Sequence, residues 1–210
     1  MVLALGLFIY FLLDHELKFI EKNTKIIKNY LAFVHITVCL TTCILGYFSS
    51  YPHIFKSIIF ANTGGFFINE VGFFIRERHF TKTNIFLIMH HIVVLIIISN
   101  APFRTYVYVL LSMAEFTNLP GCFLYHFLQR KKEYDSKKIT YNIPYEVLQK
   151  KIQLIIYFGI RVVISPYFVY QSFIYDTDRI STFNGILFVP IYAIGVFWSM
   201  KLYKNYIKLV

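Results

Sequence analysis

Two adjacent histidines, His90 and His91, lie inside an apolar stretch that runs from Ile88 to Val94. Two imidazoles give a buried helix no packing advantage over leucine or isoleucine, so their presence indicates a function. Imidazole is well suited to moving protons or acting as a nucleophile near neutral pH, and burial keeps it neutral and able to do either. The pair predicts acid–base or nucleophilic chemistry, with a structural pair of core histidines as the alternative.

Three further ionisable residues, Glu70, Glu115 and Arg161, also fall inside apolar segments. An ionised side chain in hydrocarbon costs at least about 2.5 kcal/mol, so each of them needs a partner or a role. A structural ion pair and a functional site are equally open for all three.

Helical spacing gathers polar and small residues into stripes on three apolar segments, and such stripes face the interior of a bundle. For Asn62, Gln153 and Ser165, hydrogen bonds between helices are the simpler explanation. Glu70 points about 100° away from Asn69 on its helix. The stripes are Asn62, Gly65, Asn69, Gly72 and Arg76; Tyr108, Ser112, Glu115, Cys122 and His126; and Gln153, Tyr157, Arg161 and Ser165.

Other catalytic signatures are missing from the sequence. It has no HExxH, CxxC, Walker loop or GxGxxG, and its three cysteines do not form a disulfide framework. His35, Cys39 and Cys43 share a helix face and could ligate zinc, but no fourth ligand is evident. We therefore expect no metal site.

The amino-acid composition indicates what kind of structure must position these residues. The chain has 210 residues, of which 57% are hydrophobic and 15% charged, and this excludes a disordered or simple water-soluble protein. Its net charge of +10 would suggest nucleic acid in a soluble domain. Here the basic residues lie in short runs between apolar segments, so the expected partner is the anionic face of a bilayer and not nucleic acid.

Seven apolar segments recur along the chain, and most can cross about 30 Å of hydrocarbon as helices. Strict alternation is absent, and an open sheet edge cannot survive in lipid, so the fold class is all-α membrane protein. The first segment is short for a span and is expected to extend through Phe19. The segments are Met1 to Leu13, Tyr30 to Phe48, Ile54 to Ile75, Ile85 to Ser99, Phe103 to Leu128, Ile152 to Ile174 and Phe183 to Tyr203.

Loop charges alternate as successive helices require. Seventeen of the 21 Lys and Arg residues flank the first, third and fifth connections or lie in the C-terminal tail, whereas the opposite side has only Lys56, Arg104 and Arg179. Because basic residues collect on the cytoplasmic side, the N-terminus is expected lumenal or outside and the C-terminus cytosolic. If Met1 to Leu13 does not span, the other six helices keep this orientation.

Four motifs in order resemble those of the TLC-domain family, which includes the ceramide synthases, over about Tyr30 to Lys208. Asn118 stands where the ceramide synthases have a second acid, and the chain departs from the pattern after it. The motifs are the stretch from Gly65 to Glu70, the pair His90-His91 followed by Ile92-Val93, the segment from Leu111 to Asn118, and Arg161 with Pro166-Tyr167; the departure is Leu119-Pro120-Gly121.

Residues 1–29 are expected to form a short N-terminal helix and a basic cytosolic loop, and the resemblance implies that residues 30–210 form a six-helix domain around an apolar tunnel. It implies an acyl-CoA-dependent acyltransferase of the endoplasmic reticulum or a related endomembrane, acting on an amine or hydroxyl of a lipid acceptor. Acyl-CoA is then a cosubstrate, and no cofactor is tightly bound.

In this hypothesis one histidine of the pair is the base or nucleophile and the other orients it, while Glu115 stabilises the charged imidazole. Glu70 and Arg161 form a buried pair or bind the acceptor head group. The substrate-binding residues are Glu70, Asn69, Arg161, Asn118 and Tyr157. The basic cytosolic edge would meet CoA phosphates, unless it only sets topology; it comprises Arg76, Arg78, Lys82, Arg130, Lys131 and Lys132.

Two other functions stay open. A non-enzymatic lipid-binding or cargo-trafficking membrane protein would use the same tunnel. A seven-helix receptor is suggested only by the helix count and the outside N-terminus, and the short outer loops and the intramembrane histidine pair speak against it. Besides membrane lipids, a second copy of the chain is a further partner that the sequence leaves open.

Overall fold

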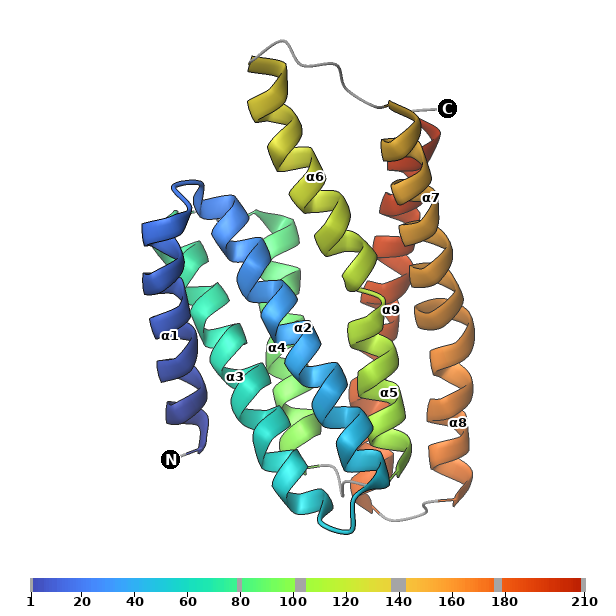
Figure 1. The fold of residues 1–210 in the computed structure, drawn as a ribbon. Helices are drawn as coiled ribbons and strands as arrows, with labels where there is room; N and C mark the ends of the chain where they lie inside the picture. Colours follow the sequence, from blue (N-terminus) through green and yellow to red (C-terminus); the bar gives the residue numbers. More distant parts are fainter. Residues whose placement is uncertain (1, 79–80, 101–104, 137–142, 176–178, 209–210) are drawn as a thin grey trace.

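The computed structural model describes residues 2–78, 81–100, 105–136, 143–175 and 179–208, and in these ranges every element is helical (Figure 1). The all-α prediction is confirmed. The elements are α1 (Val2–Ile20), α2 (Thr24–Phe48), α3 (Pro52–Arg76), α4 (Lys82–Asn100), α5 (Thr105–Phe116), α6 (Leu119–Ser136), α7 (Ile143–Phe158), the π-helix η1 (Gly159–Ile164), α8 (Ser165–Tyr175) and α9 (Arg179–Ile207).

These elements form seven helical rods, as the apolar segments predict, because α6 continues α5 and α7 runs through η1 into α8 (Figure 1). Successive rods run in opposite directions, so the two termini lie at opposite ends of the bundle. The first rod extends past Leu13, as expected, and ends at Ile20.

Among the described residues, three helices are long and apolar enough to cross a membrane: Thr24–Phe48, Pro52–Arg76 and Tyr145–Gln171. A shorter apolar helix, Asn84–Asn100, accompanies them. Many large apolar side chains point outward, including Phe11 at 62% exposure and Phe48 at 81%. Apolar surface of this extent is disfavoured in water, so the chain is a membrane protein.

The helices α1 and α3 pack so closely that their backbones are in contact. A Cβ placed on Gly6 would overlap the carbonyl oxygen of Ala61, and one placed on Gly65 would overlap the carbonyl carbon of Gly6. Only glycine allows this approach, which maximises van der Waals contact in lipid. Tyr10 of α1 is consequently buried in the same core cluster as Phe66 and Phe67 of α3.

Two irregularities interrupt the rods near the bundle centre. Pro120, the second residue of α6, lacks an N–H group and its ring would clash with a helical carbonyl four residues earlier, so α5 ends at Phe116. In η1 the backbone widens, and the Ser165 hydroxyl donates to the carbonyl of Ile160 at 2.8 Å. Irregular backbone in a membrane protein is tolerated where it is buried in protein or lines a cavity.

The turn between α1 and α2 is tied to α6 by Glu21. Its carboxylate accepts from the backbone N–H of Asn23 at 2.9 Å and from the Arg130 guanidinium at 2.6 Å. The hydrogen bond from the Asn23 N–H holds the pKa of the Glu21 carboxyl below its ordinary value, and Arg130 lowers this pKa further by a smaller amount. A lowered pKa in the folded state stabilises the fold above the unfolded-state pKa, and this contribution is lost as the pH falls through the folded-state value.

We therefore expect Glu21→Gln to lower the free energy of unfolding by up to about 1 kcal/mol near neutral pH. The difference from the wild type should shrink toward zero as the pH falls through the lowered pKa. Denaturant unfolding in detergent across the acidic range measures it. Glu16→Gln, in an exposed position, is the matched control and should change the free energy of unfolding much less. Equal changes in the two variants would contradict the role given to Glu21.

Candidate functional site

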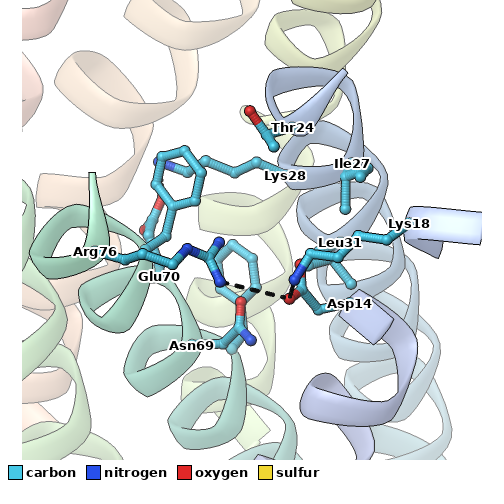
Figure 2. Close-up of a pocket in the computed structure, with 11 residues that line it drawn as sticks. Asp14, Lys18, Thr24, Ile27, Lys28, Leu31, Asn69, Glu70 and Arg76 are labelled. Atoms are coloured by element: carbon cyan, nitrogen blue, oxygen red, sulfur yellow. Dashed lines mark hydrogen bonds and ion pairs between the residues drawn. The ribbon is translucent and has the colours of Figure 1, made fainter. Parts of the chain in front are cut away.

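A cavity of about 340 Å³ lies between α2, α3, α4, the α5–α6 break, the α7–η1 rod and α9. Seven of the eight residues that the sequence predicts for the site line it: His90, His91, Glu115, Glu70, Arg161, Asn118 and Tyr157. The eighth, Asn69, lines instead a pocket of about 10 Å³ between α1, α2 and α3, beside Asp14 and Arg76 (Figure 2). That volume holds one water molecule, so Asn69 is not brought to the main cavity.

His91 is the histidine with an acidic partner. Its Nε2 lies 3.3 Å from Glu70 Oε2, and its ring stacks on Phe67 with centroids 3.6 Å apart. A carboxylate only accepts hydrogen bonds, so the proton of the neutral ring belongs on Nε2 and the lone pair on Nδ1. Nδ1 is buried without a hydrogen-bond partner, so it is an unsatisfied polar atom of a residue that lines the cavity.

Glu70 is balanced by Lys28 of α2, whose Nζ lies 2.7 Å from Glu70 Oε1. The ammonium group also lies over the ring of Phe74, 4.0 Å from its centroid. From the sequence, Lys28 is predicted only to be one of the basic residues that flank the first connection. The signal that could have found it is its spacing of seven residues from His35, which puts both on one face of α2.

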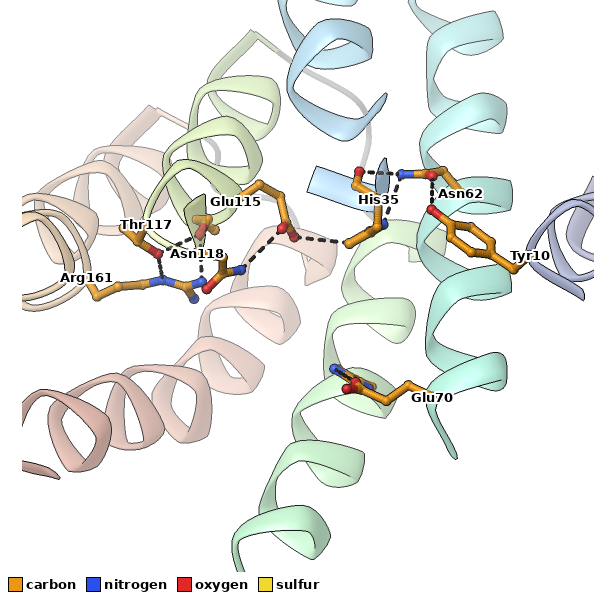
Figure 3. Close-up of polar contacts among 10 residues, drawn as sticks. Tyr10, His35, Asn62, Glu70, Glu115, Thr117, Asn118 and Arg161 are labelled. Atoms are coloured by element: carbon orange, nitrogen blue, oxygen red, sulfur yellow. Dashed lines mark hydrogen bonds and ion pairs between the residues drawn. The ribbon is translucent and has the colours of Figure 1, made fainter. Parts of the chain in front are cut away.

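Glu115 faces a histidine outside the pair. His35 Nε2 lies 3.5 Å from Glu115 Oε1, and Asn118 Nδ2 donates to Glu115 Oε2 at 3.2 Å (Figure 3). The expectation that Glu115 supports His90 or His91 is therefore corrected: Glu70 has that position beside His91. His35, weighed in the sequence only as a zinc ligand, is a site residue.

The expected ion pair between Glu70 and Arg161 is not formed. Arg161 donates from Nε to the Thr117 hydroxyl at 2.9 Å and from Nη2 to the Ala114 carbonyl at 2.7 Å (Figure 3). The Ala114 carbonyl lies at the end of α5 and accepts from the Thr117 hydroxyl as well, at 2.7 Å. A cation at this helix end also interacts favourably with the helix dipole. Arg161 thus caps the broken helix.

His90 lies between two cavities. It lines the main cavity and also an apolar cavity of about 290 Å³ between α4 and α9, whose other walls include Phe86, Met89, Pro190 and Phe197. Its Nδ1 is buried without a hydrogen-bond partner. The site therefore combines a polar side, with two histidine–carboxylate contacts, and an apolar extension.

Within the described ranges, no cluster of three or more His, Cys, Asp or Glu side chains could hold a metal ion. Cys39 and Cys43 are buried in a core cluster with Ile59 and Tyr108. Parts of the basic edge pair with acids, such as Arg76 with Asp14 at 4.0 Å, whereas the side chains of Lys82 and Lys132 lie outside the described residues.

Comparison of the chain with family models, with curated proteins and with solved structures finds no match. The chemistry of the cavity is therefore argued from its residues and their geometry.

We expect Arg161→Leu to destabilise the protein by about 1–3 kcal/mol, because it removes the donor to the Thr117 hydroxyl and one of the two donors to the Ala114 carbonyl. Thermal unfolding in detergent measures the loss. Gln153→Leu is the matched control, because Gln153 lines the same cavity and lies eight residues before Arg161 in the same rod. Its effect on stability should be clearly smaller. Equal, mild effects would mean that Arg161 does not hold the end of α5.

Proposed function

We propose that the protein is a membrane-embedded acyltransferase that moves an acyl chain from acyl-CoA to an amine or hydroxyl of a lipid acceptor. The observation that carries the proposal is the surroundings of His91. An imidazole with an oriented tautomer, a carboxylate at 3.3 Å and an unpartnered second nitrogen lines a cavity inside an apolar bundle.

The first half of the reaction uses His91 as the nucleophile. The Nδ1 lone pair forms a bond to the acyl carbon of the thioester, and the carbon–sulfur bond breaks with its electrons on sulfur, giving CoA thiolate. The acylated ring is positively charged, and the Glu70 carboxylate beside Nε2 stabilises it. Lys28 holds that carboxylate in place at 2.7 Å. The apolar helices around the cavity, set in a bilayer, would limit the access of bulk water and so protect the acyl-imidazole from hydrolysis.

The apolar cavity between α4 and α9 supports an acyl chain as the transferred group. Its described walls are almost wholly apolar, and His90 joins it to the polar cavity. A hydrocarbon chain seated there would end at the histidine pair. Removing such a chain from water is favourable by about 0.8 kcal/mol for each CH₂ group.

The motifs shared with the TLC-domain family support the same proposal, and with it a TLC-type bundle and a location in the endoplasmic reticulum or a related endomembrane. The charge distribution in the loops supports a lumenal N-terminus and a cytosolic C-terminus.

We expect His91→Gln to abolish acyl transfer, a loss of at least about 10²-fold, because the nucleophile is removed. Intact-protein mass spectrometry of the wild type with acyl-CoA and no acceptor should show an acyl adduct that is missing in His91→Gln. His90→Gln should keep the adduct, since in the described structure His90 has no carboxylate contact comparable to that of His91 with Glu70.

His126→Gln provides the control for the loss of an imidazole. His126 packs on Tyr30 and does not line the cavity, so transfer should be unaffected. Undiminished transfer by His91→Gln would contradict the proposal. Co-purified lipid without transfer to any amine or hydroxyl acceptor would instead favour the lipid-binding alternative.

The orientation is tested by inserted glycosylation acceptors. The chain has no native Asn-x-Ser/Thr sequence, so any modification reports the insertion alone. A hydrophilic insertion with an acceptor near Ser50 should be glycosylated in endoplasmic reticulum membranes, and one near Asp135 should not. A second outer position, Asp178, lies outside the described residues. Modification near Asp135 would reverse the orientation.

A further inference from the structure

A chain of polar contacts runs from the first helix into the cavity without using His90 or His91 (Figure 3). The Tyr10 hydroxyl of α1 donates to Asn62 Oδ1 at 2.6 Å, and Asn62 Nδ2 lies 3.0 Å from His35 Nδ1. His35 Nε2 in turn faces Glu115 Oε1 at 3.5 Å. Tyr10, Asn62 and His35 are all buried. The chain therefore joins α1 to a carboxylate of the cavity wall.

A backbone carbonyl sets the direction of this chain. Asn62 Nδ2 also donates to the carbonyl oxygen of His35 at 3.1 Å, and a carbonyl can only accept. The nitrogen end of the amide must then face α2, and its oxygen end faces the Tyr10 hydroxyl. The second amide N–H points at His35 Nδ1, so Nδ1 carries the lone pair. The ring proton of neutral His35 is consequently on Nε2.

This tautomer supports Glu115 as a carboxylate. One of its oxygens faces the His35 N–H, and the other accepts from Asn118 Nδ2 at 3.2 Å. Hydrogen bonds from neutral donors are strengthened when the acceptor is ionised. Because the 3.5 Å separation is long, His35 Nε2 has no hydrogen bond of good geometry, and the pair has room to tighten around a bound group.

We propose that Tyr10, Asn62 and His35 are positioning residues that hold Glu115 as the proton acceptor for the second half of the transfer. The proposal rests on the proposed function. As the acceptor nitrogen or oxygen bonds to the acyl carbon, the carbon–nitrogen bond to His91 breaks and its electron pair returns to Nδ1. The acceptor proton moves to Glu115, which passes it to the CoA thiolate. The first helix is then part of the catalytic machinery.

The sharpest variant is Asn62→Asp, which replaces the donor facing His35 Nδ1 by an acceptor of nearly equal shape. His35 must then carry its proton on Nδ1, and the Nε2 lone pair faces Glu115. Transfer to the acceptor should slow by roughly 10²-fold, while formation of the acyl adduct on His91 continues and the adduct accumulates. Tyr10→Phe removes only the hydroxyl that orients the amide and should act in the same direction, more weakly.

Two matched substitutions serve as controls. Asn29→Asp makes the same change at a buried asparagine whose Nδ2 donates to the Cys122 carbonyl at 3.0 Å, and Tyr108→Phe removes a buried hydroxyl that donates to the Pro52 carbonyl at 2.6 Å. Neither residue lines the cavity. Both controls should leave the ratio of adduct formation to transfer unchanged. An equal ratio in Asn62→Asp, with the protein folded, would overturn the inference.

The tautomer is measurable without any activity. Nitrogen NMR of ¹⁵N-histidine-labelled protein in bilayers, with His35→Gln to assign the signal, should show His35 protonated on Nε2 in the wild type and on Nδ1 in Asn62→Asp. A wild-type His35 protonated on Nδ1 would overturn the inference even if acyl transfer occurs. If no transfer occurs with any acceptor, the proposed function fails, and with it the role given to Glu115, whereas the tautomer assignment stands or falls on this spectrum.

Discussion

The cost of placing charge inside an apolar bundle governs how the helices of this protein are arranged. Each intramembrane charge lies where other groups hydrogen-bond to it or neutralise it. Glu70 contacts Lys28 and His91, Glu115 faces His35 and accepts from Asn118, and Arg161 donates to the end of α5. Because most of these partners come from other helices, the charges gather the helices around one polar cavity.

The break between α5 and α6 and the π-helix η1 lie opposite each other, and a side chain from η1 caps the end of α5. Pro120 ends α5 in the middle of the bundle, where the Ala114 carbonyl accepts from the Thr117 hydroxyl at 2.7 Å. The π-helix places Arg161 opposite this carbonyl, where its guanidinium donates to Ala114 and to Thr117. The same irregularities form part of the cavity wall, since Asn118 and Arg161 both line it. Two departures from regular helix thus provide both a stable cap and polar side chains for the site.

Part of the composition of the cavity can be identified from periodicity. Polar residues at helical spacing in an apolar segment are expected to face inward, and this holds for Glu115, Tyr157 and Arg161, which line the cavity. Glu70, His90 and His91 belong to none of the polar stripes; they are singled out because they are ionisable side chains in apolar segments. Their convergence on one cavity is consistent with that reasoning. The stripe on α3 faces inward only in part. Asn62 and Gly65 are buried, whereas Gly72 and Arg76 are exposed and Asn69 lines the small pocket between α1, α2 and α3. Glu70, about 100° away from Asn69, is the residue that lines the main cavity.

Hydrophobicity and helical period are properties of each segment alone, so the all-α fold class, the seven apolar segments and part of the inward-facing residues could be predicted from the chain. Which groups meet could not be predicted in this way. The pairing of His91 with Glu70, of His35 with Glu115 and of Arg161 with the α5 carbonyl depends on the rotation and depth of helices that are distant in the chain. The contacts of Tyr10 and Lys28 could not be predicted for the same reason. Tyr10 lies in a short apolar segment and reaches Asn62 because α1 and α3 pack closely at their glycines. Lys28 lies in a basic run and reaches Glu70 through its long side chain.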